Sequence, residues 1–173
     1  DGSSAWRWVI DPMDGTKEFT RRIPEFGVSI ALTMNGEPVV GVILNPTAGS
    51  AVWASEGGGT FRDGTRVRVS NKTQLADAVV IASRTEISRN QFEPYQGWFA
   101  ELRPLGSIAW KLACIASGEG DLNISVAPKN EWDVCAGDVV ALPISSGISK
   151  PWRFISRATW TISSSEGVIR PDN

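Results

Sequence analysis

Apolar residues in the first half of the chain recur in short runs that are separated by turn-forming residues. The runs are rich in β-branched and aromatic residues, which is typical of strands. They lie at residues 6–10, 27–34, 39–44, 51–54, 60–62 and 67–69. Between two of them, Asn35-Gly36 is the dipeptide that favours a tight hairpin turn. The first half is therefore predicted to be a meander of antiparallel strands.

The pattern changes near residues 73–78, after which predicted strands alternate with predicted helices. The strands are expected at 79–82 and 122–126, and the helices at 88–102, 108–116 and 133–142. Within the first of these helices, Pro94 is an interruption.

We therefore divide the chain into two parts. Residues 1–76 form an antiparallel β-sheet part, and residues 77–173 form an α/β part. The predicted fold class is α/β (α+β).

Length and composition limit the function classes. The 173 residues suffice for one large domain or two small ones with a sizeable core. With 42% hydrophobic and 21% charged residues, the chain is not expected to be disordered. A net charge of −2 gives no general electrostatic footprint for nucleic acid. No apolar run approaches the ~18 residues of a membrane span, so we expect no membrane partner.

The chain contains no histidine, which excludes Ser-His-Asp and Cys-His catalysis and His-ligated zinc. Carboxylates, hydroxyl groups and metal ions therefore remain as the candidate catalytic groups. Cys114 and Cys135 lie among small apolar residues. They could form a disulfide, but we favour two buried, reduced thiols, which is consistent with a reducing compartment and predicts a cytoplasmic location.

Two carboxylates follow the first predicted strand. Asp11 and Asp14 flank a Pro-Met dipeptide, and Gly15-Thr16 leads into a short predicted helix that starts at Lys17 with Thr16 as its cap. Carboxylate oxygens bind hard divalent cations, and amides at a helix start can hold phosphate. The alternative is that both aspartates only cap a turn and a helix.

Asp133 is a third carboxylate of the same kind. It follows Trp132 and precedes the small residues 134–137, which allow tight helix packing. Its position is that of a helix cap, which is the alternative interpretation. We nevertheless expect Asp11, Asp14 and Asp133 to converge on one oxygen-rich site.

Two long motifs resemble the signatures of the inositol monophosphatase superfamily. The first is the run from Trp8 to Phe19, which contains Asp-Pro-Met-Asp-Gly-Thr, and the second is Trp-Asp-Val-Cys-Ala-Gly at 132–137. The resemblance covers about residues 6–142. It implies a lithium-sensitive, Mg²⁺-dependent phosphomonoesterase with a layered αβαβα sandwich of the sugar-phosphatase type. The partner would be a small phosphorylated nucleotide or sugar, attacked by metal-activated water.

The matched positions imply roles for individual residues. Metal ligation falls to the side chains of Asp11, Asp14 and Asp133 and to the main-chain carbonyl of Met13. A complete site would hold two or three Mg²⁺ ions, and fewer are expected here. Gly15 and Thr16 would contact phosphate, with Thr16 and Asp14 as the catalytic residues.

The first motif is most similar to the CysQ-like branch, the 3′(2′),5′-bisphosphate nucleotidases. Inositol phosphatases typically have Asn where this chain has Glu18, and an acidic residue where it has Val126. The resemblance therefore predicts hydrolysis of the 3′(2′)-phosphate of adenosine bisphosphate, of the PAP or PAPS type. An inositol monophosphatase-type sugar phosphatase is the alternative.

Three further residues are candidates for substrate binding. Lys129 could meet the second phosphate of a bisphosphate, or could simply be a solvated lysine. Gly106 and Ser107 match the family's substrate-side loop, although they could instead only start a helix.

The sequence also departs from the family pattern. The family has an upstream Gly-Glu-Glu segment that binds metal, whereas no Glu occurs among the ten residues before Asp11. We therefore expect the fold to lack its N-terminal helices and the chain alone to have weak or no activity. The sheet face that these helices cover would favour association, for which a homodimer is one form. A truncated remnant that binds metal or nucleotide without turnover is a further alternative.

Residues 143–173 do not match the family pattern and receive no functional interpretation. A haloacid-dehalogenase-like phosphatase is disfavoured, since its motif places two aspartates two positions apart and here they are three apart.

Overall fold

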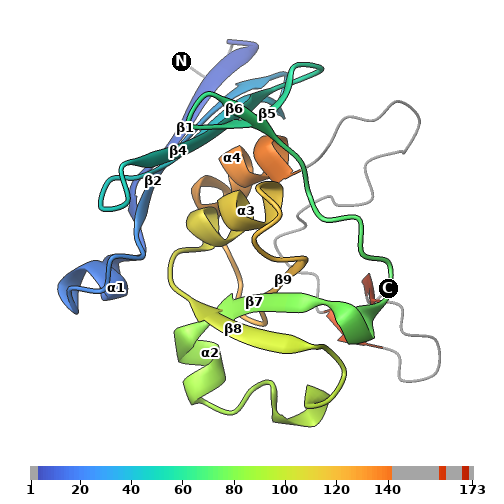
Figure 1. Cartoon of the computed structure of the whole chain (residues 1–173). Coiled ribbons are helices and arrows are strands. Elements are labelled where there is room, and N and C mark those ends of the chain that lie inside the picture. Colours follow the sequence, from blue (N-terminus) through green and yellow to red (C-terminus); the bar gives the residue numbers. More distant parts are fainter. Residues whose placement is uncertain (1–3, 142–159, 163–168, 172–173) are drawn as a thin grey trace.

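The computed structural model describes residues 4–141, 160–162 and 169–171, which form two main sheets with helices between them (Figure 1). The larger sheet is antiparallel, and its six strands follow sequence order. They are β1 (Trp6–Asp14), β2 (Gly27–Met34), β3 (Glu37–Asn45), β4 (Ser50–Ser55), β5 (Gly59–Arg62) and β6 (Thr65–Val67). The predicted antiparallel meander is thus confirmed.

The smaller sheet is parallel and has the strand order β8-β7-β9. Its strands are β7 (Val79–Ser83), β8 (Glu101–Leu105) and β9 (Leu122–Ile124). Two short strands, β10 (Trp160–Ile162) and β11 (Ile169–Pro171), pair separately.

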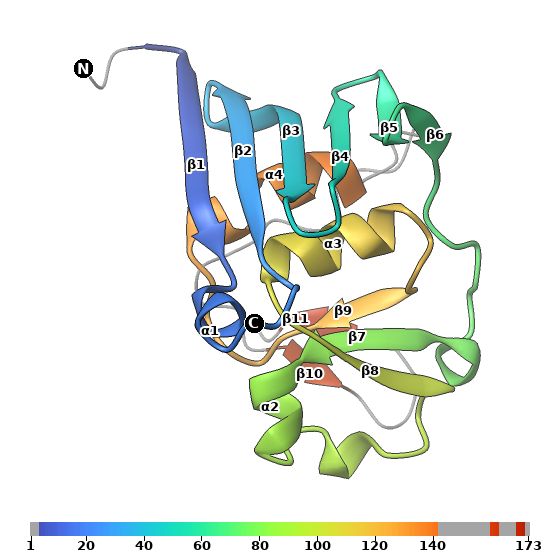
Figure 2. The same cartoon turned by 60° about the vertical axis from the view of Figure 1, so that its left-hand side comes forward.

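Two of the helices lie between the sheets. The helices are α1 (Thr16–Thr20), α2 (Arg84–Ser88), α3 (Ile108–Ala116) and α4 (Glu131–Ala141), with short 3₁₀ turns η1 (Leu75–Asp77) and η2 (Glu93–Tyr95). In both views α3 and α4 separate the two sheets, and α2 lies beyond the parallel sheet (Figures 1 and 2). The expected layered sandwich is therefore present in part, as antiparallel sheet, helices, parallel sheet and helix. No helix within the described ranges is long and apolar enough to cross a membrane.

The segment 88–102 was predicted to be helical, and this prediction is wrong. Helix α2 ends at Ser88, Asn90 adopts a left-handed φ of 57°, and the chain then enters β8. The sequence concealed this strand because it contains Pro104, which lacks a backbone donor. β8 is an edge strand of the parallel sheet, where a proline can be tolerated.

The core lies between the inner face of the antiparallel sheet and the helix pair. Alternate residues of β2, including Ala31 and Thr33, are buried on this face. On α4, a Cβ at Gly137 would lie 2.1 Å from a Leu112 side-chain carbon of α3, so close helix packing requires glycine. The sequence prediction of tight packing at 134–137 therefore holds.

Both cysteines are buried in this core and neither forms a disulfide. Burial, reinforced by the nearby Glu119 carboxylate, raises the pKa of Cys114 to about 12. Burial likewise raises the pKa of Cys135 to about 11. The predicted pair of unreactive core thiols is confirmed.

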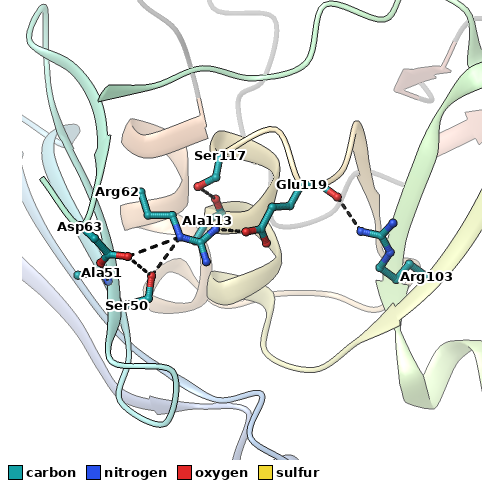
Figure 3. Close-up of polar contacts among 8 residues, drawn as sticks. All are labelled: Ser50, Ala51, Arg62, Asp63, Arg103, Ala113, Ser117 and Glu119. Atoms are coloured by element: carbon teal, nitrogen blue, oxygen red, sulfur yellow. Dashed lines mark hydrogen bonds and ion pairs between the residues drawn. The ribbon is translucent and has the colours of Figure 1, made fainter. Parts of the chain in front are cut away.

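Polar contacts connect the two sheets past the C-terminal end of α3 (Figure 3). Arg62 of β5 forms an ion pair with Glu119, and its Nε donates to Ser50 Oγ at 3.1 Å. The backbone carbonyl of Glu119 in turn accepts from Arg103 of β8 at 2.7 Å. These contacts fix the position of the parallel sheet relative to the antiparallel sheet.

The outer face of the antiparallel sheet is also apolar. Trp8 pairs with Leu32 and Ile10 pairs with Ile30 across β1 and β2, so these residues share one face. Trp8 is 62% exposed and Ile10 is 52% exposed. No described element covers this face, and a contiguous apolar surface of this kind favours association.

The double substitution Trp8→Glu/Ile10→Glu is expected to convert self-associated chain to monomer, as measured by sedimentation velocity. Since both side chains are half exposed or more, the melting temperature should change by only about 2 °C. The control is Trp132→Glu, which alters a tryptophan that is 48% exposed but lies on α4 outside the sheet. A wild-type chain that already sediments as a monomer at micromolar concentration would contradict this expectation.

Candidate metal and phosphate site

Asp11 and Asp14 lie at the end of β1 rather than in the turn that the sequence predicted. In a regular strand, residues three apart point to opposite faces of the sheet. Here the register with β2 shifts between Asp11 and Asp14, and Asp11 Oδ1 accepts a hydrogen bond from the Met13 backbone at 2.9 Å. This bulge allows two carboxylates at an odd spacing to reach one point.

Asp133 comes from a different part of the fold. Helix α4 begins at Glu131, so Asp133 lies inside its first turn and the predicted cap position is wrong. Its Oδ2 accepts from the backbone N–H and the side-chain amide of Asn130, at 2.8 and 3.2 Å. Asp133, in the first turn of α4, thus binds the residue that precedes the helix, and these bonds fix the orientation of its carboxylate.

The three aspartates converge. Ligand atoms of Asp11, Asp14 and Asp133 all lie within 4.8 Å of one another, and each residue is partly buried. Each carboxylate is anchored through one oxygen, which leaves the other oxygen available to a ligand. Oxygen donors at this separation fit a hard divalent cation such as Mg²⁺.

The electrostatics of the cluster also favour a cation. Burial raises the pKa of Asp11, and the charges of Asp14 and Asp133 raise it further. Burial and repulsion from Asp133 raise the pKa of Asp14, although hydrogen bonds from Ser107 and Ala109 oppose this effect. A bound cation would relieve both the desolvation and the repulsion.

The loop before α3 holds Asp14 in place. Asp14 Oδ2 accepts from Ser107 Oγ and from the Ala109 backbone, both at 2.6 Å. Ser107 Oγ also accepts from the Trp110 backbone at 3.0 Å, and its residue has a left-handed φ of 54°. A serine in this conformation is strained. Its hydrogen bonds to Asp14 and to the start of α3 hold it in this conformation.

The predicted phosphate residues follow directly after β1. Gly15 has φ 91°, and a Cβ there would lie 2.9 Å from the Glu25 carbonyl oxygen. Gly15, and not Thr16, is the residue that precedes α1, so the predicted Thr16 cap is wrong. The Thr16 hydroxyl instead donates to the Met13 carbonyl oxygen at 3.2 Å. That carbonyl is the predicted main-chain metal ligand.

Glu25 connects three elements next to the site. Its carboxylate forms an ion pair with Arg84 at the start of α2, and its Oε2 accepts from the Gly106 backbone at 2.7 Å. Gly106 directly precedes Ser107, which anchors Asp14. Glu25 therefore positions the predicted substrate-side loop, a role that sequence reasoning missed because its partners are 59 and 81 residues away.

A cavity of about 450 Å³ opens beside the carboxylates. The predicted residues that line it are Asp14, Gly15, Thr16, Gly106, Ser107, Lys129 and Asp133. Two residues that the sequence analysis did not single out, Glu86 and Lys111, line it as well. The available signal for Lys111 was a lone charge within the apolar run 108–116. The predicted phosphate and substrate residues thus line one space, together with Asp14 and Asp133. Asp11 and Met13 do not line it, although Asp11 belongs to the carboxylate cluster beside it.

Comparison with known proteins identifies relatives of the chain. Residues 1–142 match the model of the Inositol monophosphatase family. The "Inositol-1-monophosphatase" of Rhizobium meliloti is 35% identical over 140 residues, which are 77% of this chain and 52% of that protein. The chain spans about half the length of the curated relatives it matches.

Solved structures show the same similarity. The extragenic suppressor protein SuhB of Bartonella henselae has a TM-score of 0.70 at 32% identity, covering 80% of this chain and 55% of that one. The protein SaIMPase-II, solved with bound inositol monophosphate and with bound 2′-AMP, is 24% identical. With inositol monophosphate it has a TM-score of 0.72 and covers 82% of this chain and 57% of its own, a similarity that shows the fold alone. These names are those of inositol monophosphatases and SuhB, and not of the CysQ-like branch.

Replacing Asp11 by Asn tests the cation site. In metal-free buffer the variant should melt at the same temperature or higher, since one of three repelling charges is removed. Mg²⁺ at 100-fold its dissociation constant should stabilise the wild-type chain by about 2.7 kcal/mol and the variant much less. Differential scanning calorimetry measures both effects. Asp63→Asn, which alters an aspartate outside the cluster, should retain the Mg²⁺ response; an equal response in Asp11→Asn would refute the site.

Acidification tests the Glu25 contacts. Burial alone would raise the pKa of Glu25, but hydrogen bonds from Arg84 and Gly106 lower it below 4.5. Glu25 therefore contributes stability above pH 4.5 that is lost as the pH falls through its folded-state pKa. When the pH is lowered from about 6 to about 3.5, the free energy of unfolding in urea should fall less for Glu25→Gln than for the wild type. Glu101→Gln removes an exposed ion pair with Arg103 and should behave like the wild type.

Proposed function

Because the chain belongs to the inositol monophosphatase family, we propose that it carries the metal- and phosphate-binding part of a Mg²⁺-dependent phosphomonoesterase. The substrate class is a small phosphorylated sugar, polyol or nucleotide. One observation carries the proposal, namely the convergence of Asp11, Asp14 and Asp133 within 4.8 Å. The names of the relatives favour a phosphorylated sugar or inositol as the substrate over a nucleotide.

The donor set fits a hard cation, which the carboxylates of Asp11, Asp14 and Asp133 and the Met13 carbonyl would hold. Such a cation supplies Lewis acidity toward a phosphate ester. The chain's own residues orient the reactants. Gly15 lets the chain turn with φ 91° and pass close to the Glu25 carbonyl oxygen, and this turn leads the backbone into α1 beside the cavity. The Thr16 hydroxyl donates to Met13, so its oxygen remains an acceptor that can orient water.

Gly106 and Ser107 act through the carboxylate cluster in this proposal. The Gly106 N–H is engaged by Glu25, and the Ser107 hydroxyl is engaged by Asp14. Both residues therefore position Asp14 next to the substrate. Positioning of this kind can affect rate as strongly as a direct contact, because in-line displacement depends on orientation.

A nucleotide bisphosphate is the second candidate substrate. Val126 lies at the cavity and is 52% exposed, at the position where inositol phosphatases have an acidic residue. An apolar side chain there removes a partner for sugar hydroxyls. Adenosine 3′,5′-bisphosphate is the specific form of this candidate.

Binding without turnover is the third candidate. Among the described residues, the candidate metal cluster consists of three aspartates and includes no glutamate. Loss of well-placed catalytic groups commonly costs about 10²–10⁴ in rate. We therefore propose that the chain of 173 residues binds metal but turns over slowly.

The experiment combines metal titration with phosphate release. The purified chain should bind Mg²⁺ by calorimetry, and Asp133→Asn should weaken this binding about tenfold or more. Asp121→Asn, which removes a carboxylate paired with Lys72 elsewhere, should leave it unchanged.

Phosphate release is then measured from inositol 1-phosphate and from adenosine 3′,5′-bisphosphate at saturating Mg²⁺. We expect rates at least about 10²-fold below those of a complete family member. Rates within tenfold would show that the three aspartates suffice for turnover, and failure to bind Mg²⁺ would refute the proposal as a whole.

A further inference from the structure

Glu86 of α2 is a buried carboxylate that the proposed reaction does not use. Its residue is only 5% exposed, and it lines the cavity beside the carboxylate cluster. Its Oε1 accepts from Ser125 Oγ at 2.8 Å and from the Ala127 backbone N–H at 3.1 Å. Both donors lie in the loop of residues 125–130, which connects β9 to α4. Glu86 therefore holds the part of this loop that follows β9.

Lys111 of α3 compensates the charge of Glu86. Its residue is 3% exposed, and it lines the same cavity. Burial, and next the charge of Lys129, lower the pKa of Lys111 to about 8, and the attraction of Glu86 opposes this shift. Oε2 of Glu86 has no hydrogen-bond partner among the described residues, so the two groups attract each other without direct contact. Attraction between two buried charges offsets part of the cost of burying each. Oε1 therefore remains available to the loop.

The far end of the same loop holds one of the candidate metal ligands. Asp133 Oδ2 accepts from the Asn130 backbone N–H at 2.8 Å and from the Asn130 side-chain amide at 3.2 Å. Only two residues, one of them Pro128, separate Ala127 from Asn130. Proline has a fixed φ, and each residue spans at most about 3.3–3.6 Å, so this link is short and stiff. The position of Asn130, and with it the orientation of the Asp133 carboxylate, therefore depends on the bond between Glu86 and Ala127.

Helix α4 itself is held by other contacts. Arg7 of β1 forms an ion pair with Glu131 at the start of the helix. Ser29 Oγ of β2 donates to the Trp132 carbonyl oxygen at 3.3 Å. Loss of the Glu86 bonds should therefore release the loop while the helix stays in place.

We propose that Glu86 is a positioning residue for the metal site, which orients the Asp133 carboxylate through residues 125–130. This inference rests on the proposed function, because that function makes Asp133 a metal ligand. The arrangement parallels that of Glu25, which positions Asp14 through the loop before α3. Two glutamates outside the cluster thus hold two of its three aspartates.

The test uses the chain of 173 residues and Tb³⁺, a luminescent hard cation that takes oxygen ligands as Ca²⁺ does. Calorimetry measures the affinity, and luminescence lifetimes in H₂O and D₂O give the number of water molecules on the ion. Glu86→Leu removes the acceptor and keeps a side chain of similar size. Its affinity for Tb³⁺ should fall about tenfold, the lower end of the range for groups that orient a metal ligand. The ion should gain about one water, because a hard cation accepts water in place of a lost ligand.

Three further variants separate the hydrogen bonds from charge and from folding. Glu86→Gln keeps a carbonyl oxygen that can accept from Ser125 and Ala127, so its Tb³⁺ affinity should stay within about twofold of the wild type. Pro128→Gly, at an exposed residue, leaves Glu86 intact but loosens the link, and it should also weaken Tb³⁺ binding. This variant keeps the test decisive if Glu86→Leu does not fold. Glu101→Leu, at an exposed glutamate of β8, is the matched control and should change neither affinity nor water number.

A double-mutant cycle decides whether Glu86 acts through Asp133. In the Asp133→Asn background, Glu86→Leu should weaken Tb³⁺ binding by only about twofold or less, since the group that it positions is already impaired. In the Asp11→Asn background, Glu86→Leu should retain its full effect. Equal losses in both backgrounds would show a general structural role and overturn the proposal.

The outcomes separate this proposal from the proposed function. If the wild-type chain binds Tb³⁺ and Mg²⁺ but Glu86→Leu binds equally well, the positioning role is refuted and the proposed function stands. The same conclusion follows if Glu86→Gln binds as weakly as Glu86→Leu, because charge and not the hydrogen bonds would then carry the effect. If the wild-type chain binds neither ion, the proposed function fails and the positioning role fails with it.

Discussion

Mutual repulsion among three partly buried carboxylates is the constraint around which the described structure is organised. Asp11, Asp14 and Asp133 lie within 4.8 Å of one another, although burial and neighbouring charge oppose ionisation of the first two. Such an arrangement persists only if the surrounding fold holds each group separately. Hydrogen bonds from three different places do so: the β1 bulge, the loop before α3, and the residue before α4. The stability of the rest of the fold therefore supports a local arrangement that is unfavourable until a cation binds.

The layered architecture explains how these anchors reach one point. β1 ends where α1 begins, and the starts of α3 and α4 approach the same region. The tight α3–α4 contact at Gly137 and Leu112 fixes the two helix starts relative to each other. The contacts of Arg62 and Arg103 with Glu119 then fix the position of the parallel sheet (Figure 3). Helix α2 follows strand β7 of this sheet, and its Arg84 forms the ion pair with Glu25. Each layer thus contributes one group that positions the site.

Charge is distributed unevenly within the cavity. Asp14 and Asp133 of the carboxylate cluster line it, and so do Lys111 and Lys129. A cation at the cluster would offset the charge of these carboxylates and make the cavity more favourable to anionic groups. The names of the relatives describe the reaction of those proteins, whereas the preference of any such site for one substrate depends on the residues that line it.

The sequence alone determined the antiparallel meander, the buried thiols and the three candidate aspartates, because these depend on local patterns such as alternation, the Asn35-Gly36 turn and carboxylates after a strand. It did not predict strand β8, since Pro104 is tolerated only at a sheet edge, and an edge is defined by the tertiary structure. The predicted helix starts at Lys17 and Asp133 also differ by one and two residues from the observed starts at Thr16 and Glu131, because neighbouring residues of one turn compete as helix start. Glu25 and Lys111 became candidates only in the folded structure. Their partners, burial and cavity are set by residues far away in sequence, and a single charge in the sequence carries no record of them.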